Sequence, residues 1–188
     1  MTASASLAKK KILVTGAPGI GKTTLIKKIS DELKDLHPVG FYTDEIRGEG
    51  IRKGFELISL DGRKGILSRI DLRSPHRVGK YSVDIEGFED FLDSIPFSSP
   101  STHLVIIDEI GKMECLSGQF RKCLKELLNS DKWVIATIAL KGSGLIEEIK
   151  GRNDMKLFEI TKTNRDSLLC DIIREVTSNK LSSPGACR

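Results

Sequence analysis

The 188-residue sequence has few of the features that would place it outside the cytoplasm. It contains no apolar run near the roughly 18 residues that cross a membrane, and its first residues lack the apolar core of a signal peptide. The four cysteines include no CxxC pair and the three histidines have no metal-ligand spacing, so neither a disulfide framework nor a zinc site is indicated. We therefore expect a cytoplasmic protein with reduced thiols and no membrane partner.

Aromatic residues and excess charge of one sign are also scarce. Thirty Lys and Arg residues against 26 Asp and Glu give a net charge of +4, and aromatic residues make up 5% of the chain. This balance is too weak to define a nucleic-acid-binding protein by itself. The length and the hydrophobic fraction of 39% suit one folded domain, which we expect over residues 10–180, with disordered tails at 1–9 and 181–188.

Short β-branched runs alternate with amphipathic segments along most of the chain, which is typical of a sheet flanked by helices. Apolar runs of strand length stand at residues 11–15, 104–107, 133–139 and 155–160. Helical spacing is expected from the end of a glycine-rich turn to about residue 37, and at 117–129, 145–149 and 164–178. The uninterrupted apolar runs favour parallel strands that are buried on both faces.

The segment 38–80 differs from its surroundings because its strand patterns follow one another without helices. Strands are expected at residues 39–46, 51–60 and 65–70, and Asp61–Gly62 is a hairpin signal. We predict an antiparallel β-hairpin insertion over 38–80 in a mainly parallel α/β sheet, and a short helix within residues 81–91.

Residues 16–23, GAPGIGKT, match the phosphate-binding pattern GxxxxGK[ST] between an expected strand and an expected helix. Glycine permits close backbone approach, so that successive N–H groups and the helix dipole face one anion. Lys22 can then reach the β- and γ-phosphates of a triphosphate, and the Thr23 hydroxyl is a hard oxygen ligand for Mg²⁺. The predicted nucleotide-binding residues here are Gly16, Ala17, Pro18, Gly19, Ile20, Gly21, Lys22, Thr23 and Thr24.

A second signal is LVIIDEIG at residues 104–111, where four apolar residues are followed by Asp108 and Glu109. An Asp at the carboxyl end of a strand near the phosphate-binding loop can hold a water of Mg²⁺. Glu109 is then suited to orient and deprotonate a water in line with the γ-phosphate, which favours hydrolysis over a kinase reaction that excludes water. We predict Lys22, Asp108 and Glu109 as catalytic residues, with Thr23 and Asp108 at the metal.

Six strings resemble one family in its own order and span about residues 11–178: GAPGIGKTTL, GFYTDEIR, GFELISLDG, VGKYSVDI, VIIDEIGKME and ITKTNRD. The family is that of the small nucleoside-triphosphatases that include the cancer-related nucleoside-triphosphatase. The resemblance implies a three-layer α/β phosphate-loop fold and nucleotide contacts at residues 16–23 and 108–111. It also implies Mg²⁺-dependent hydrolysis of ATP, GTP and other nucleoside triphosphates to the diphosphate and phosphate, with loose base selectivity.

The segment 47–80 carries nine Lys or Arg residues against four acidic residues, a local charge of +5. One interpretation is a phosphate-rich partner, either the triphosphate tail or a nucleic acid. The other is an ordinary solvated hairpin face, which we favour because only Phe55 and Tyr81 in and beside this segment could stack on bases.

Several further residues are open to more than one interpretation. A cation that neutralises the transferring phosphoryl group is often an arginine, and the candidates are Arg47, Arg69, Arg121 and Arg165. Lys112 either reaches the phosphates or lies at the surface. Thr137 either senses the γ-phosphate or packs within its strand. Asn164 and Arg165 are predicted to contact the purine, although Thr163 or Asn164 could instead simply cap the closing helix.

The sequence therefore predicts a cytoplasmic, Mg²⁺-dependent nucleoside-triphosphatase. A kinase that passes the γ-phosphate to a nucleotide or another small acceptor is the first alternative, and a nucleotide-dependent RNA-binding switch is the second. The preferred base and the physiological substrate stay open, as does the oligomeric state, for which a monomer is the default expectation.

Overall fold

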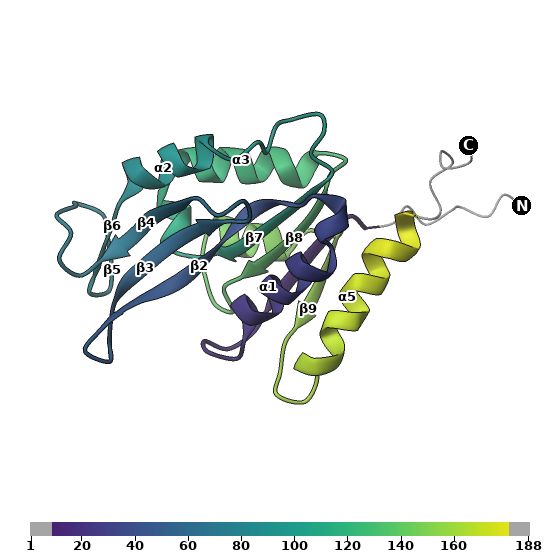
Figure 1. Ribbon diagram of the computed structural model, residues 1–188, viewed down its shortest axis with the longest axis horizontal. Coiled ribbons are helices and arrows are strands. Elements are labelled where there is room, and N and C mark those ends of the chain that lie inside the picture. Colours follow the sequence, from purple (N-terminus) through teal and green to yellow (C-terminus); the bar gives the residue numbers. More distant parts are fainter. Residues whose placement is uncertain (1–8, 181–188) are drawn as a thin grey trace, which may run out of the picture.

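The computed structural model describes residues 9–180, in which one nine-stranded mixed sheet lies between two layers of helices (Figure 1). The strand order is β5-β6-β4-β3-β2-β7-β8-β1-β9. The predicted three-layer α/β fold is thus confirmed. The tails predicted at residues 1–9 and 181–188 lie, apart from Lys9, outside the described residues.

One half of the sheet is parallel. Its strands are β1 (Lys11–Thr15), β7 (Leu104–Ile110), β8 (Trp133–Ile138), β9 (Met155–Glu159) and the first part of β2 (Val39–Gly48). All five residues of β1 are buried, as is almost all of β7. These strands are apolar on both faces because helices cover both faces.

The other half is antiparallel and is more extensive than one hairpin. It runs from β2 through β3 (Ile51–Ser59), β4 (Lys64–Arg69) and β6 (Tyr81–Val83) to β5 (Arg77–Val78) at the edge. Four strand pairs in the sheet are antiparallel and four are parallel. The predicted insertion therefore continues the main sheet through β2, which pairs with β3 on one side and β7 on the other.

The helices divide between the two faces of the sheet. On one face α2 (Ile85–Asp93), α3 (Gly118–Asn129) and α4 (Leu145–Lys150) contribute to a core around Phe41, Phe88 and Phe120. On the other face α1 (Lys22–Glu32) and α5 (Arg165–Lys180) cover the second core, and α1 and α5 lie side by side (Figure 1). Two short 3-10 turns complete the described elements, at Lys34–Leu36 and Glu114–Leu116.

The helix predicted within residues 81–91 begins later than expected, because Tyr81–Val83 forms β6. The backbone of Asp84 leaves the strand, and its side chain accepts a hydrogen bond from the Gly87 N–H at 3.0 Å. This N-cap satisfies an amide that the helix itself cannot pair, so α2 starts at Ile85. None of the helices in residues 9–180 has the length and apolar character that a membrane crossing needs.

Gly40 marks the position where the parallel and antiparallel halves meet. A Cβ atom on Gly40 would lie 1.8 Å from the carbonyl oxygen of Ile106 on β7, and its φ of 140° is one that other residues rarely adopt. The close pairing of β2 with β7 therefore depends on glycine at this position.

Candidate active site

The predicted phosphate-binding loop connects β1 to α1 and folds back on itself. Gly21 caps α1 in a left-handed conformation, with φ of 110°, so glycine is favoured there. Lys22 is buried, and its Nζ donates to the carbonyl oxygen of Gly16 at 3.1 Å. The loop thus fixes the lysine ammonium beside its own first residue, at the N-terminal end of α1, where helix amides favour an anion.

Asp108, on β7, is bonded to two threonine hydroxyls from neighbouring elements. The Thr23 Oγ1 donates to Asp108 Oδ2 at 2.6 Å, and the Thr137 Oγ1 donates to Asp108 Oδ1 at 2.5 Å. Burial raises the pKa of Asp108, which is 1% exposed, while the hydrogen bonds from Thr137 and Thr23 act in the opposite direction. Thr137, for which two roles were open, orients this carboxylate in the structure.

Glu109 is the carboxylate of the pair that faces the cavity. Its Oε2 lies 3.9 Å from Lys22 Nζ, and its side chain is 31% exposed. Burial raises the pKa of Glu109, the Lys22 ammonium lowers it, and the Asp108 charge raises it again. A glutamate whose pKa is raised is a stronger base than one in water, which suits proton abstraction.

Glu114 is a third carboxyl near this pair, and the sequence analysis did not single it out. It lies in the 3-10 turn after β7 and is buried, and burial raises its pKa to about 8. Its own backbone N–H and that of Gly111 lower the pKa, and the charges of Glu109 and Asp108 raise it. An acidic residue in a turn is ordinarily exposed, so the residue type gives no sign that Glu114 is buried. The one signal in the sequence is that Glu114 ends the string VIIDEIGKME, which also contains Asp108 and Glu109.

One cavity of about 820 Å³ joins the predicted loop to the antiparallel strands. Its walls are the loop and the start of α1, then Glu109 with residues 139–141 after β8, and finally the β2–β3 pair. The β2–β3 residues that line it are Thr43, Asp44, Glu45, Arg52 and Phe55. Lys27 on α1 also lines the cavity and pairs with Asp44 at 2.8 Å.

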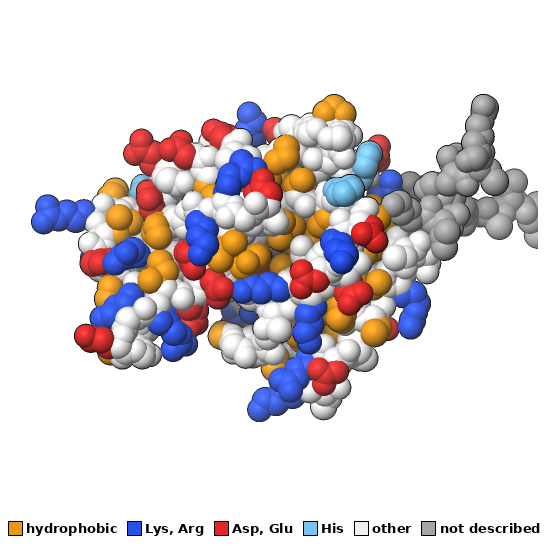
Figure 2. Space-filling view, in the orientation of Figure 1, with side chains coloured by type: hydrophobic (Ala, Val, Ile, Leu, Met, Phe, Trp, Pro, Cys, Tyr) orange, Lys and Arg blue, Asp and Glu red, His pale blue; other side chains and the backbone are white. Residues whose placement is uncertain are grey.

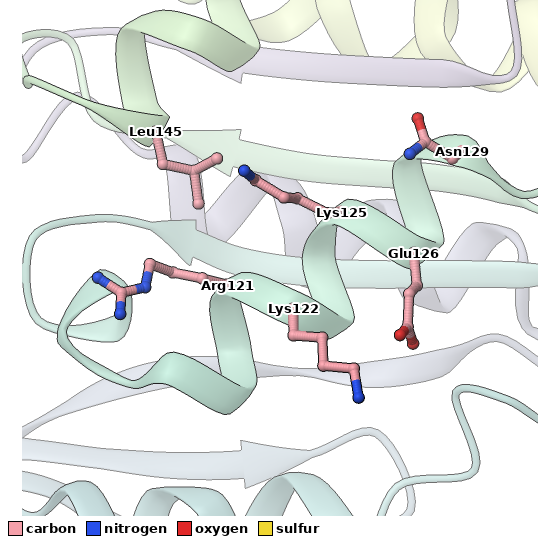
Figure 3. Close-up of a pocket in the computed structure, with 6 residues that line it drawn as sticks. All are labelled: Arg121, Lys122, Lys125, Glu126, Asn129 and Leu145. Atoms are coloured by element: carbon pink, nitrogen blue, oxygen red, sulfur yellow. The ribbon is translucent and has the colours of Figure 1, made fainter.

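None of the four candidate arginines lines this cavity. Arg47 pairs with Glu45, Arg69 pairs with Asp71, and Arg165 lies 3.9 Å from Asp166. Arg121 is on α3, where it lines a separate pocket with Lys122, Lys125, Glu126, Asn129 and Leu145 (Figure 3). The arginine that does line the cavity is Arg52, which was not among the candidates; Lys112 is exposed and does not line it.

Asn164 uses both ends of its side-chain amide within the β9–α5 loop. Its Oδ1 accepts from the Thr161 N–H at 2.8 Å, and its Nδ2 donates to the Glu159 carbonyl oxygen at 2.8 Å. The purine contact predicted for Asn164 and Arg165 stays a prediction, since neither residue lines the cavity that contains the loop.

Much of the charge in segment 47–80 is paired. Arg47 and Arg52 both contact Glu45, and Arg63 contacts Asp61. Lysine, arginine and acidic side chains are interspersed over this end of the molecule on the face shown in Figure 2. This arrangement supports the interpretation of an ordinary solvated hairpin face.

The fold and this geometry define a phosphate-loop nucleotide-binding protein of the α/β class. The nucleoside-triphosphatase ("NTPase") family model matches residues 11–173, and the chain belongs to this family. It is 48% identical over 171 residues to "Nucleoside-triphosphatase THEP1" of Thermotoga sp. (strain RQ2), covering 90% of this chain and 97% of that one.

Two further relatives agree with this assignment. The "Cancer-related nucleoside-triphosphatase" of Homo sapiens is 41% identical over 189 residues, which covers 91% of this chain and 98% of the human protein. The crystal structure of THEP1 from Aquifex aeolicus superposes with a TM-score of 0.75 at 36% identity, covering 86% of this chain and 96% of that one. The predicted membership of a family of hydrolases is therefore confirmed.

Proposed function

We propose that the chain hydrolyses nucleoside triphosphates, ATP and GTP among them, to the diphosphate and phosphate with Mg²⁺ and with loose base selectivity. The observation that carries this proposal is the 2.6 Å bond between Thr23 and Asp108. This bond joins the start of α1 to the end of β7, and it brings the Lys22 ammonium and the Glu109 carboxylate to the same cavity.

The residues present fit Mg²⁺ by their donor chemistry. Mg²⁺ prefers oxygen ligands, and in nucleotide sites it is held through one or two carboxylates together with substrate phosphates and waters. The Thr23 hydroxyl and the Asp108 carboxylate are two such oxygens, already adjacent. When bound, Mg²⁺ would neutralise charge on the β- and γ-phosphates.

The chain's own residues supply positioning and proton transfer. The loop amides and Lys22 bind the phosphates, with the Lys22 ammonium exchanging its bond to the Gly16 carbonyl for phosphate oxygens. Glu109 accepts a proton from the attacking water as the water oxygen bonds to the γ-phosphorus and the bond to the β–γ bridging oxygen breaks. Thr137 keeps Asp108 in place during this step.

Loose base selectivity is supported by the bonding of Asn164. Strong discrimination between bases requires polar groups that are left unpaired by the wrong base. The amide of Asn164 accepts one bond from the Thr161 N–H and donates one to the Glu159 carbonyl oxygen, and both bonds are made whichever base is bound.

The proposal is tested by phosphate release from ATP, GTP, CTP and UTP, with Mg²⁺ and with a chelator in its place. We expect release from several bases, and loss of release with the chelator. Lys22→Ala should weaken nucleotide binding, whereas Lys28→Ala, an exposed lysine on the same helix, is the matched control and should behave as wild type. Failure of the wild type to release phosphate from any triphosphate would overturn the proposal.

A further inference from the structure

We propose that Lys141 is a further catalytic residue, whose ammonium contacts the γ-phosphate and neutralises the charge that develops there during hydrolysis. The proposal rests on the proposed function, because the γ-phosphate has to lie between Lys22 and Glu109 for water to attack it. Lys141 follows β8 and lines the cavity. It was not among the cations predicted from the sequence, and none of the four predicted arginines lines this cavity.

The charged groups of the cavity include one cation more than they include acids. The side chains concerned are Lys22, Lys27, Arg52 and Lys141, with Asp44, Glu45 and Glu109. Glu109 lies 3.9 Å from Lys22, and Asp44 lies 2.8 Å from Lys27. Glu45 lies 2.7 Å from Arg52. Lys141 makes no hydrogen bond or ion pair with any of the residues 9–180, so a phosphate can engage it without breaking an existing pair.

The two cations on the outer side of the cavity are held there by a second contact each. The Arg52 Nε donates to the Tyr81 hydroxyl at 2.9 Å. The Lys27 ammonium lies 4.4 Å from the centre of the Tyr42 ring, where it is attracted to the ring face. Either cation would have to give up two contacts to reach the γ-phosphate, which leaves Lys141 as the better candidate.

The order of the strands brings the segment after β8 to the place where the γ-phosphate has to lie. β8 pairs with β1, which leads into the phosphate-binding loop, and with β7, which carries Glu109. Figure 1 shows β7 and β8 side by side in the sheet. Because parallel strands end at the same edge of a sheet, the chain leaves β8 between the loop and Glu109.

Two hydrogen bonds hold the backbone that leads to Lys141. The Ala139 N–H donates to the carbonyl oxygen of Ile110 on β7 at 3.1 Å. The Leu140 carbonyl oxygen accepts from the Nζ of Lys150 on α4 at 2.7 Å. The segment is thus fixed to a strand on one side and to a helix on the other. A side chain on a fixed backbone loses less conformational entropy when it engages a ligand.

An ammonium at this position acts on the hydrolytic step already described. The water oxygen bonds to the γ-phosphorus, the bond to the β–γ bridging oxygen breaks, and the diphosphate leaves with the electron pair of that bond. In the transition state, negative charge is spread over the outer oxygens of the γ-phosphoryl group. Lys141 donates a hydrogen bond to one of these oxygens and keeps its proton throughout, while Lys22 contacts the phosphates from the loop.

The experiment measures phosphate release from ATP with Mg²⁺ by the full chain and by three variants. Lys141→Gln removes the charge, and kcat should fall by about 100-fold or more, as for the loss of other donors of this kind. Lys141→Arg keeps the charge and should stay within about tenfold of wild type. Lys122→Gln, an exposed lysine on α3 outside the cavity, is the matched control and should retain wild-type kcat. Lys141 is itself exposed, so each variant should fold.

Binding measurements separate a catalytic role for Lys141 from a structural one. ADP ends at the β-phosphate, so its Kd should be the same in Lys141→Gln and wild type within error. ADP with aluminium fluoride, which takes the place of the transferring phosphoryl group, should bind about 100-fold more weakly to Lys141→Gln. This pattern is expected of a group that stabilises the transition state rather than the bound nucleotide.

The remaining outcomes separate this inference from the proposed function. Wild-type kcat in Lys141→Gln would overturn the inference and leave the hydrolase standing. It would also be overturned if Lys141→Arg were as slow as Lys141→Gln, because the charge would then not be what the reaction needs. An equal loss of affinity for ADP would overturn it too, since it would place the lysine at the diphosphate. Failure of the wild type to release phosphate would overturn both.

Discussion

The parallel and antiparallel halves of the sheet place their charged groups differently. In the parallel half, Lys22 and Asp108 are buried, and their positions are set by neighbouring strands and helices. In the antiparallel half, ion pairs such as Arg69–Asp71 and Arg63–Asp61 lie at the surface between residues close in sequence. Buried charge is costly unless it is partnered, so its presence in one half alone indicates where the chemistry takes place.

The comparison also separates two kinds of stabilisation. Strands of the parallel half contribute to both cores, since Ile107 packs on one face of β7 and Ile106 on the other. Outer strands of the antiparallel half have one buried face and one that water reaches. Substitutions should therefore have large effects in the parallel half and small effects in the outer strands, and the following experiments test this difference.

The largest effect is expected for the cavity carboxylate of the parallel half. Glu109→Gln keeps the shape of the side chain but cannot accept a proton, so kcat for phosphate release should fall by about 10²- to 10⁴-fold while nucleotide binding persists. Glu56→Gln, at an ion pair with Lys64 on the antiparallel strands and outside the cavity, is the control and should retain wild-type kcat. Wild-type hydrolysis by Glu109→Gln would show that another group activates the water.

The second largest effect is expected on stability, when a buried isoleucine of the parallel half and an exposed isoleucine of the antiparallel half are each replaced. Ile106 is 0% exposed on β7, and Ile51 is 54% exposed on β3. Ile106→Ala should lower the free energy of unfolding by about 2–5 kcal/mol, because it removes buried methylene groups and leaves a cavity. Ile51→Ala should change it by less than about 0.5 kcal/mol. Denaturant unfolding of both variants measures the difference, and equal losses would contradict the distinction between the halves.

The third effect is a pH dependence caused by Glu114. In the folded state this carboxyl keeps its proton up to about pH 8, whereas the unfolded chain releases it near 4.5. The folded state therefore binds more protons between these values, and the stabilisation present at low pH is lost as pH rises through that window. One such proton changes the free energy of unfolding by about 1.4 kcal/mol per pH unit, or about 2 kcal/mol from pH 5.5 to 7.

Glu114→Gln removes this titrating group and leaves Asp108 and Glu109 unchanged. Its free energy of unfolding should therefore fall less steeply with pH than that of the wild type, when both are measured by denaturant titration from pH 5 to 8.5. Parallel pH profiles for the two proteins would mean that Glu114 is ionised in the folded state.

The smallest effect is expected at the exposed pair of Arg69 and Asp71. Both side chains are solvated, so their attraction is screened and is offset by the entropy of holding the long Arg69 side chain in one position. Arg69→Gln should leave the thermal midpoint unchanged within error at low and high salt. A clear fall in the midpoint at low salt would show that the outer strands depend on their ion pairs.

The phosphate-binding loop and the Asp108–Glu109 pair could be predicted because their signals are local. A fixed spacing of glycines and lysine, or an apolar run that ends in acids, depends on neighbours in sequence. The positions of Arg52 and Glu114 could not be predicted in this way. Arg52 lines the cavity as part of β3, which pairs with β2, and Glu114 is buried in the 3-10 turn that follows β7. Neither position follows from the neighbours of these residues in sequence.

Dependence on residues distant in sequence also explains why the helix predicted within residues 81–91 begins later than expected. Tyr81–Val83 is only three residues long, and it becomes a strand because β4 and β5 pair with it. The parallel strands were easier to predict, since burial on both faces leaves an uninterrupted apolar run.

Gly40 constrains the place where the parallel and antiparallel halves of the sheet meet. There is no space for even one carbon atom between Gly40 on β2 and the Ile106 carbonyl on β7. The two halves of the sheet are therefore in close backbone contact at this point. The first part of β2, from Val39 to Phe41, is therefore anchored to the strand that carries Asp108. Residues of β2 and β3 beyond Phe41 lie outside this contact, so substitutions there leave the close approach of Gly40 to Ile106 unchanged.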